Sequence, residues 1–128
     1  MRIEDHNSLC HATDPRKIDE VLGRRFDNGI NAFWLSHGDE KFPAINLLVN
    51  GDLAYLHYFP GEDHPGFASV GDLENLDPEG QTTFLLETFS DSLQILNEHV
   101  VLFSDALKAA QEFAKSAGLP KCIQWDEL

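Results

Sequence analysis

AINLLVNGDLAYLHYF, residues 44–59, is the stretch of sequence that decides the fold. Asn50-Gly51 separates two apolar runs. This dipeptide is the strongest short-range signal for a β-hairpin, because both central residues of the turn must adopt a positive φ. The sequence therefore predicts two antiparallel strands, 44–49 and 53–59. Alternation places Tyr55, His57 and Phe59 on one face of the second strand, and Leu56 and Tyr58 on the other.

The segments on both sides of the hairpin complete a small sheet with two helices. Asp14-Pro15 predicts a capped helix from residue 15 to about 25, which includes Arg24-Arg25. A second helix is predicted after Ser104 as its N-cap and ends at Gly118-Leu119-Pro120. Its expected apolar face comprises Leu107, Ala110, Phe113, Ala114 and Ala117.

Short strands are predicted at 33–35, 67–70, 82–87, 93–96, 99–103 and 122–125, with loops at 60–66 and 71–81. The fold class is α+β: residues 1–128 form a single domain with a mostly antiparallel β-sheet and a helix near each end of the chain.

Acidic residues dominate the middle of the chain. The formal net charge is -13 and the sequence pI is about 4.6. No lysine or arginine occurs from Phe42 to Leu107, a stretch that holds Asp52, Glu62, Asp63, Asp72, Glu74, Asp77, Glu79, Glu87, Asp91, Glu98 and Asp105. Such a surface attracts basic proteins and repels nucleic acid and anionic membranes. The simpler alternative is that the acidic residues only keep the protein soluble and bind no partner.

Cofactor chemistry and catalysis find little support in the sequence. His57 and His64, beside Glu62 and Asp63, are suitable zinc ligands by type, but their spacing matches no helical metal site. The chain lacks a nucleophile elbow, a P-loop and a dinucleotide fingerprint. Cys10 and Cys122 are predicted to be free thiols, at least one of them buried. We predict that the protein is not an enzyme and that it binds neither a metal ion nor a cofactor.

The N-terminal sequence reaches acidic residues at once, and no run of 18 apolar residues occurs. We therefore expect a cytoplasmic protein that does not contact membranes or nucleic acid. Because the sequence holds no basic stripe that could bind phosphates, a protein partner is favoured.

Several short patterns resemble a known family when they are taken in order. Phe42-Pro43-x-Ile45-Asn46 precedes the hairpin turn, and Tyr55-x-His57-Tyr58-Phe59 follows it. Gly66-Phe67-x-Ser69-x-Gly71 comes next, and Trp125-Asp126-Glu127-Leu128 ends the sequence. Over residues 31–128 the chain resembles the Imm-one family of immunity proteins from bacterial polymorphic toxin systems.

The resemblance implies a cytoplasmic antitoxin that binds and blocks a cognate secreted toxin, often a nucleic-acid deaminase. With the charge pattern, it predicts that acidic loops occlude the substrate site of a basic-surfaced toxin. The expected toxin-binding residues are Phe59, Glu62, Asp63, His64, Phe67, Asp72, Glu74, Asp77 and Glu79. The motif residues expected to act structurally are Phe42, Pro43, Tyr55, His57, Gly66, Ser69, Gly71, Trp125, Glu127 and Leu128.

Two other function classes stay open at this point. One is a generic acidic adaptor or DNA-mimic inhibitor, which would bind many basic proteins with a steep dependence on salt. The other is a small enzyme that uses His57 or His64 with a nearby carboxylate. The sequence indicates neither an oligomeric state nor which toxin is bound.

Overall fold

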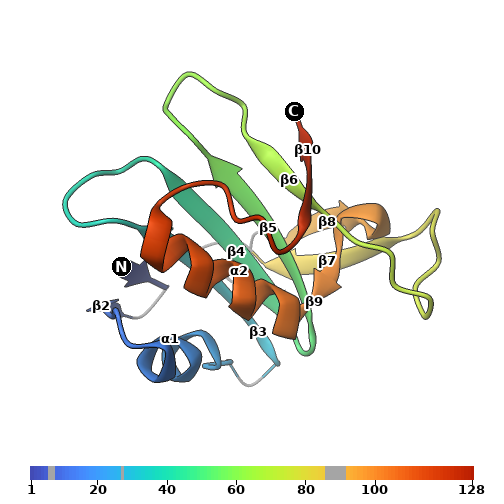
Figure 1. The fold of residues 1–128 in the computed structure, drawn as a ribbon. Coiled ribbons are helices and arrows are strands. Elements are labelled where there is room, and N and C mark those ends of the chain that lie inside the picture. Colours follow the sequence, from blue (N-terminus) through green and yellow to red (C-terminus); the bar gives the residue numbers. More distant parts are fainter. Residues whose placement is uncertain (6–7, 27, 86–91) are drawn as a thin grey trace.

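The computed structural model describes residues 1–5, 8–26, 28–85 and 92–128. Its elements in chain order are β1 (Arg2–Glu4), β2 (Leu9–His11), α1 (Pro15–Leu22), β3 (Ile30–Ser36), β4 (Ala44–Asn50), β5 (Leu53–Phe59), β6 (Phe67–Val70), β7 (Gln81–Leu85), β8 (Ser92–Leu96), the 3-10 turn η1 (Asn97–His99), β9 (Val101–Leu102), α2 (Phe103–Ser116) and β10 (Gln124–Glu127). The predicted α+β class, with an antiparallel sheet and a helix near each end, is confirmed (Figure 1).

One main sheet contains most of the strands. Its order is β10-β6-β5-β4-β3-β1-β2, with β9 pairing beside β5, and every pairing is antiparallel. The predicted hairpin lies at its centre, where β4 and β5 pair from Asn50 opposite Leu53 to Ala44 opposite Phe59. Gly51 in the turn has a φ of +58°, as the Asn-Gly signal predicts, but Asn50 does not have a positive φ. Asn50 instead ends β4 and pairs with Leu53, so the turn consists of Gly51 and Asp52.

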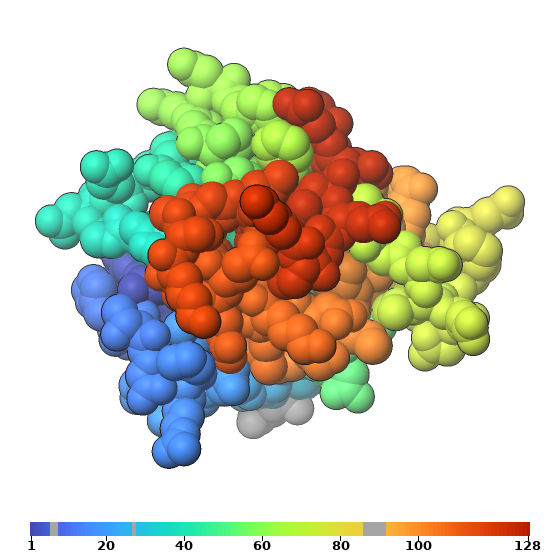
Figure 2. Space-filling view, in the orientation of Figure 1, coloured from blue at the N-terminus to red at the C-terminus, as the bar shows by residue number. Residues whose placement is uncertain are grey.

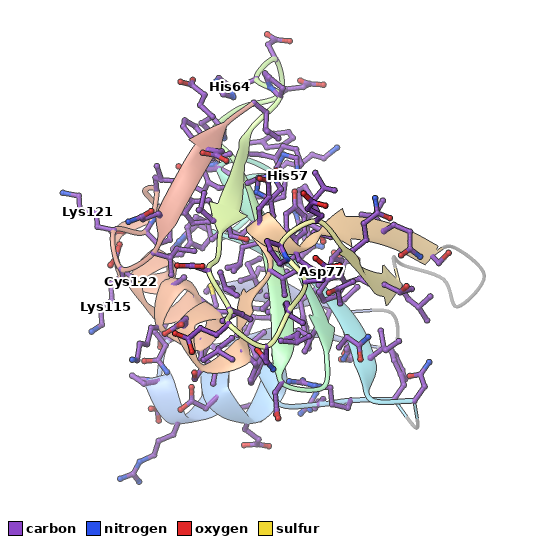
Figure 3. The ribbon with its side chains drawn as sticks, turned by 90° about the vertical axis from the view of Figure 1, so that its right-hand side faces the viewer. His57, His64, Asp77, Lys115, Lys121 and Cys122 are labelled. Carbon is purple, nitrogen blue, oxygen red and sulfur yellow. The ribbon has the colours of Figure 1, made fainter. Side chains whose placement is uncertain are left out.

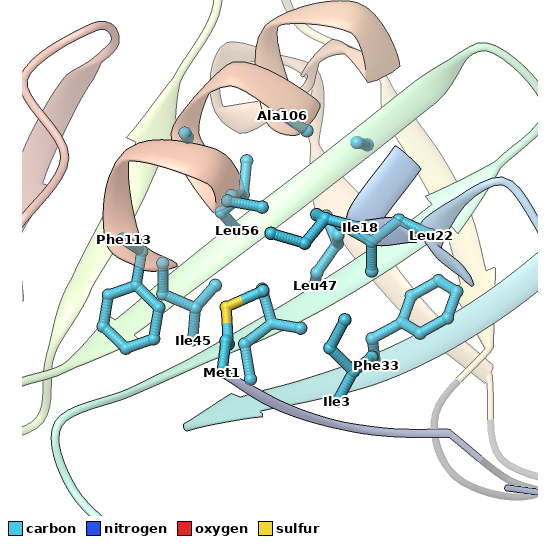
Figure 4. Close-up of a cluster of buried hydrophobic side chains, with 14 of the residues drawn as sticks. Met1, Ile3, Ile18, Leu22, Phe33, Ile45, Leu47, Leu56, Ala106 and Phe113 are labelled. Carbon is cyan, nitrogen blue, oxygen red and sulfur yellow. The ribbon is translucent and has the colours of Figure 1, made fainter. Parts of the chain in front are cut away.

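The two faces of this sheet are covered differently. On one, here called the helix face, α1 and α2 pack over the sheet and bury the main core, which includes Ile18, Leu47, Leu56 and Phe113 (Figure 4). The other face is called the hairpin face here, after the β7–β8 hairpin that lies on it. Strands β7 and β8 form a separate two-stranded sheet that packs through Phe84 and Ile95 against Leu48 and Tyr55. The β7–β8 hairpin contacts β3 and β4 and covers only part of this face of the main sheet.

The helices differ in detail from the prediction. Asp14 caps α1 as expected, with its carboxylate accepting a hydrogen bond from the Arg16 N–H at 3.0 Å. However, α1 ends at Leu22, because Gly23 caps it and disfavours continuation; Arg24 and Arg25 therefore lie beyond the helix.

The second helix begins one residue before the predicted cap. Phe103 opens α2 after Leu102, so Ser104 lies in the first turn and is not the cap. The buried face of α2 consists of Ala106, Ala109, Ala110 and Phe113, whereas Leu107, Ala114 and Ala117 are half-buried. Small alanine side chains let the helix approach the sheet closely, which a search for large apolar residues misses.

Several strands were also misplaced or missed. Strands β1 and β2 were not predicted, because each has three residues and carries polar side chains. The strand predicted at 99–103 shrinks to β9, because η1 and α2 take the residues on either side. The last strand is Gln124–Glu127 instead of 122–125. The predicted strand 82–87 appears as β7, with Gln81 added and residues 86 and 87 outside the described ranges.

Both cysteines are free, as predicted. The expectation that at least one is buried is wrong: Cys10 is half-buried at the edge strand β2, and Cys122 is exposed after α2. Among the described residues, no helix is long and apolar enough to cross a membrane.

Candidate protein-binding surface

His57 joins the hairpin face of β5 to the loop that follows the strand. Its Nε2 lies 2.8 Å from the carbonyl oxygen of Pro65, and its Nδ1 lies 3.3 Å from the hydroxyl of Tyr55. Because a carbonyl oxygen only accepts, Nε2 carries the proton and Nδ1 accepts from Tyr55. Burial lowers the pKa of His57, which favours this neutral form. His57 thus holds the 60–66 loop against the sheet.

Three small motif residues, Gly66, Ser69 and Gly71, allow close packing around β6. A β-carbon at Gly66 would collide with the His57 ring and lie 2.7 Å from the carbonyl oxygen of Tyr58, and Gly66 has a φ of +100°. A β-carbon at Gly71 would collide with the backbone of Val100. The buried Ser69 hydroxyl donates to the His99 carbonyl at 2.7 Å and accepts from the Leu56 N–H at 3.1 Å.

The terminal motif is tied to the same region through β10, which pairs with β6. The Trp125 indole N–H donates to the Pro120 carbonyl at 2.7 Å, and its ring lies 6.3 Å from that of Tyr58 on the helix face. The Leu128 N–H donates to the Gly66 carbonyl at 2.9 Å, while its side chain stays exposed.

His64 and Glu127 connect the 60–66 loop to the end of the chain. The Nε2 of His64 lies 2.9 Å from a Glu127 carboxylate oxygen, and its Nδ1 accepts from the Gly66 N–H at 2.8 Å. The His64 ring also stacks on Phe67, with 5.2 Å between centroids. His64 and Phe67, both predicted to contact a toxin, therefore also serve to order this loop.

The structure separates the predicted toxin-binding residues into two regions. The 60–66 loop precedes the four-residue strand β6 and the 71–80 loop comes after it. His64 and Asp77 therefore lie well apart (Figure 3). Phe59 and Phe67 belong to opposite faces of the sheet: Phe67 packs beside Tyr58 on the helix face, whereas Phe59 stacks on His57 on the hairpin face. One flat partner surface would not meet both rings.

The carboxylates of both loops face solvent. Glu62, Asp63, Asp72, Glu74, Asp77 and Glu79 are all exposed. Among the described residues, no lysine or arginine lies within 4.0 Å of these six carboxylates; the ion pairs with such bases are Arg2–Glu4 and Lys17–Glu20. The 71–80 loop protrudes from one side of the molecule (Figure 2). Its charges are therefore available to a basic partner.

Both loops border the hairpin face. The 60–66 loop is held there by the bond between His57 and Pro65, and the 71–80 loop packs Leu73 and Leu76 against the core beneath β7 and β8. Most basic residues gather on the other side: seven of the nine lie in or directly after α1 and α2, namely Arg16, Lys17, Arg24, Arg25, Lys108, Lys115 and Lys121. Figure 3 shows Lys115 and Lys121 on the side away from Asp77.

An aromatic patch lies on the part of the hairpin face that β7 and β8 leave open. It consists of Trp34, Phe42 and Phe59, all partly exposed. The Trp34 and Phe59 rings stack with centroids 5.7 Å apart, and Phe42 meets them edge-on at 6.3 and 6.4 Å. Phe42 and Phe59 could be singled out from the sequence, but Trp34 could not, because only the pairing of β3 with β4 brings it to this face.

A hollow of about 500 Å³ adjoins the aromatic patch. Glu4, Asp5, Trp34, Lys41 and Asn46 contribute to its lining. Glu4, Trp34 and Asn46 follow one another across β1, β3 and β4, since they are direct cross-strand partners. Its charged groups are the carboxylates of Glu4 and Asp5 and the ammonium group of Lys41, and the Arg2 guanidinium pairs with Glu4 at 3.5 Å.

The described residues contain no group of three or more His, Cys, Asp or Glu side chains placed to hold a metal ion. His57 and His64, the two histidines considered as ligands, instead face Pro65 and Glu127. The geometry is thus that of a contact surface: partly exposed rings and a hollow, bordered by exposed carboxylates, which resembles the apolar centre and polar rim of protein interfaces.

No family model matches the chain. A comparison with curated proteins finds 25% identity over 129 residues with the double-stranded DNA deaminase immunity protein of Burkholderia cenocepacia strain H111, covering 100% of both chains. The chain is similar to a deaminase immunity protein. The predicted resemblance to immunity proteins is confirmed at this level, and it extends over the first 30 residues, where no motif had been recognised.

Proposed function

We propose that this chain is an immunity protein that binds a deaminase toxin in the cytoplasm and blocks its activity without catalysing a reaction. The observation that carries the proposal is the similarity, over the full length of both chains, to an immunity protein named for a double-stranded DNA deaminase. Full-length coverage supports a common fold and a common task better than a shared short motif would.

The charge distribution supports the same function. A deaminase that acts on nucleic acid binds a polyanion, so its substrate groove carries positive charge. Glu62 and Asp63 on one loop, and Asp72, Glu74, Asp77 and Glu79 on the other, offer negative charge without a lysine or arginine within 4.0 Å in the described residues. We infer that these loops cover the entrance to the groove, where they exclude the substrate both sterically and electrostatically.

The resemblance to immunity proteins of polymorphic toxin systems implies that a toxin gene lies beside the gene for this chain. The direct test uses the toxin domain that this neighbouring gene encodes, with deamination of single- and double-stranded DNA oligonucleotides as the readout. We expect added immunity protein to abolish deamination at a one-to-one ratio, and the two proteins to co-purify. A neighbouring gene that encodes no deaminase, or a deaminase that stays fully active with excess protein, would contradict the proposal.

The same experiment distinguishes a generic DNA mimic. A mimic would inhibit unrelated basic nucleic-acid enzymes about as well as the neighbouring toxin, because its binding depends on charge alone. An immunity protein discriminates through packed contacts as well as charge. We therefore expect an unrelated deaminase and a basic nuclease to keep their activity at concentrations that silence the neighbouring toxin.

A further inference from the structure

We propose that the aromatic patch and its adjoining hollow are the anchoring site for the toxin, and that a basic side chain of the toxin enters the hollow. This inference rests on the proposed function and adds to it the contact surface and the chemistry of the occupant. The acidic loops would then guide the approach, while the patch provides the packed contact.

The location of the patch supports this role. On the helix face, α1 and α2 cover the sheet, and β7 and β8 cover the part of the hairpin face around Leu48 and Tyr55. At the other end of β3, β4 and β5, Trp34, Phe42 and Phe59 form the surface themselves, because Ser36 and Ala44, the small residues on the same face, are only 1% and 0% exposed. Clustered aromatic rings are the residues that most often dominate binding energy at protein interfaces.

The hollow has the chemistry of a site for an arginine or lysine side chain. Glu4 supplies a carboxylate, Asn46 supplies an amide, and the Trp34 ring supplies an aromatic surface. The Asp5 carboxylate adds negative charge to the lining, but it already accepts hydrogen bonds from Ser8 and Asn31. Carboxylates bind a guanidinium or ammonium group by charge-assisted hydrogen bonds, and an indole face attracts the same cation. Lys41 also lines the hollow, with its ammonium group 5.6 Å from the centroid of Phe42, and the Arg2 guanidinium pairs with Glu4 at 3.5 Å. A toxin cation would therefore replace Arg2 as the partner of Glu4, in an exposed ion pair that contributes little to stability.

Charge complementarity favours a basic toxin, and not a second copy of this chain, as the partner that covers the patch. With a formal net charge of -13, two copies repel each other. The exposed residues Asp39 and Glu40, in the connection that also carries Phe42, add negative charge to the border of the patch. A basic toxin surface is attracted by this border and can bury the rings.

The test compares dissociation constants for the neighbouring toxin domain across a small set of variants. Trp34→Ala and Phe59→Ala should each weaken binding at least about 30-fold, as expected for central interface residues. Glu4→Gln removes the carboxylate that would pair with the toxin cation in the hollow, and should weaken binding by about 5- to 30-fold.

Glu20→Gln is the matched control for Glu4→Gln. Both carboxylates are exposed and pair with a nearby base, at 3.7 Å for Glu20 and 3.5 Å for Glu4, but Glu20 lies on α1 at the helix face. We expect Glu20→Gln to change affinity less than twofold. Leu102→Ala, at an exposed leucine beside α2, is the corresponding control for the ring variants.

Circular dichroism and thermal unfolding of each variant show whether it is folded, and Glu4→Gln keeps the inference testable if a ring variant is not. Tight binding by folded Trp34→Ala and Phe59→Ala, or equal losses in Glu4→Gln and Glu20→Gln, would overturn the anchoring site while leaving the proposed function intact. A wild-type protein that neither binds nor inhibits the toxin would instead reject the proposed function.

Discussion

His57 is located where the aromatic patch meets the 60–66 loop, and its protonation matters for both. Burial lowers its pKa, and the structure uses the neutral ring as a donor to Pro65 and an acceptor from Tyr55. Protonation would put a charge into this partly buried site and would require the Tyr55 hydroxyl to turn from donor to acceptor. Acid should therefore loosen this junction.

The pH dependence has a definite sign. In the unfolded chain the pKa of His57 is about 6.5, and in the folded protein burial lowers it. Between the two values the unfolded chain binds more protons, so the free energy of unfolding decreases as the pH falls through 6.5 toward the folded pKa. The stabilising contribution is fully present above the unfolded pKa.

We predict that His57→Gln removes part of this pH dependence, because glutamine keeps a donor for Pro65 and does not titrate. Urea midpoints measured from pH 8 to pH 5 should fall more steeply for the wild type than for the variant. Parallel curves for the two proteins would show that His57 is not held neutral by the fold.

Gly66 is the residue whose substitution should most directly disturb the same junction. A β-carbon there meets the His57 ring and the Tyr58 backbone at a φ of +100°. We predict that Gly66→Ala lowers the free energy of unfolding by about 2–4 kcal/mol, from backbone strain and overpacking together.

The control is Gly38→Ala, since Gly38 also has a positive φ, +54°, but nothing lies within 4 Å of its β-carbon position. It should cost only the backbone term, about 1 kcal/mol. Chemical denaturation of both variants checks the difference, and equal losses would mean that the close approach to His57 is unimportant.

The two helices start in different ways, and this can be tested. Asp14 accepts a hydrogen bond from the Arg16 N–H, whereas α2 begins without any side-chain cap. We predict that Asp14→Ala destabilises the protein by about 1 kcal/mol and that Ser104→Ala stays within about 0.5 kcal/mol of wild type. A loss of 1 kcal/mol at Ser104 would restore it as the cap that the sequence indicated.

Elements with strong local signals were predictable, and elements that depend on pairing were not. Asn50-Gly51 and Asp14-Pro15 encode their turn and helix start within a few residues, so the β4–β5 hairpin and the start of α1 were predicted correctly. Strands β1 and β2, with three residues each, exist because β3 pairs with β1. Strand β10 includes Asp126 and Glu127, since ladder bonds to β6 need no apolar side chain.

The candidate surface shows the same division at the scale of the whole molecule. The acidic loops could be recognised from the sequence, because a stretch without lysine or arginine is visible in the letters alone. The aromatic patch could not, because Trp34, Phe42 and Phe59 come from three separate segments that meet only when β3, β4 and β5 pair in register. The sequence likewise gave no indication that Phe59 and Phe67 face opposite ways.

Charge at the scale of the whole molecule should control the rate of association more than the final affinity. Carboxylates on the two loops border the hairpin face, whereas most basic residues lie in or after α1 and α2. We predict that Glu62→Gln/Asp63→Asn and Asp72→Asn/Glu74→Gln each slow association with the toxin by about threefold or more. Asp19→Asn/Glu20→Gln removes the same charge from α1 and should slow it less.

The central claim is that the acidic loops 60–66 and 71–80 attract a basic toxin. Its most direct test is the association rate constant of the wild-type protein with the neighbouring toxin domain, measured by stopped flow from 50 to 500 mM salt. The account predicts a fall of at least about tenfold across this range, because added salt screens the attraction between an acidic surface and a basic one. A rate constant that stays flat, or that rises with salt, would contradict it.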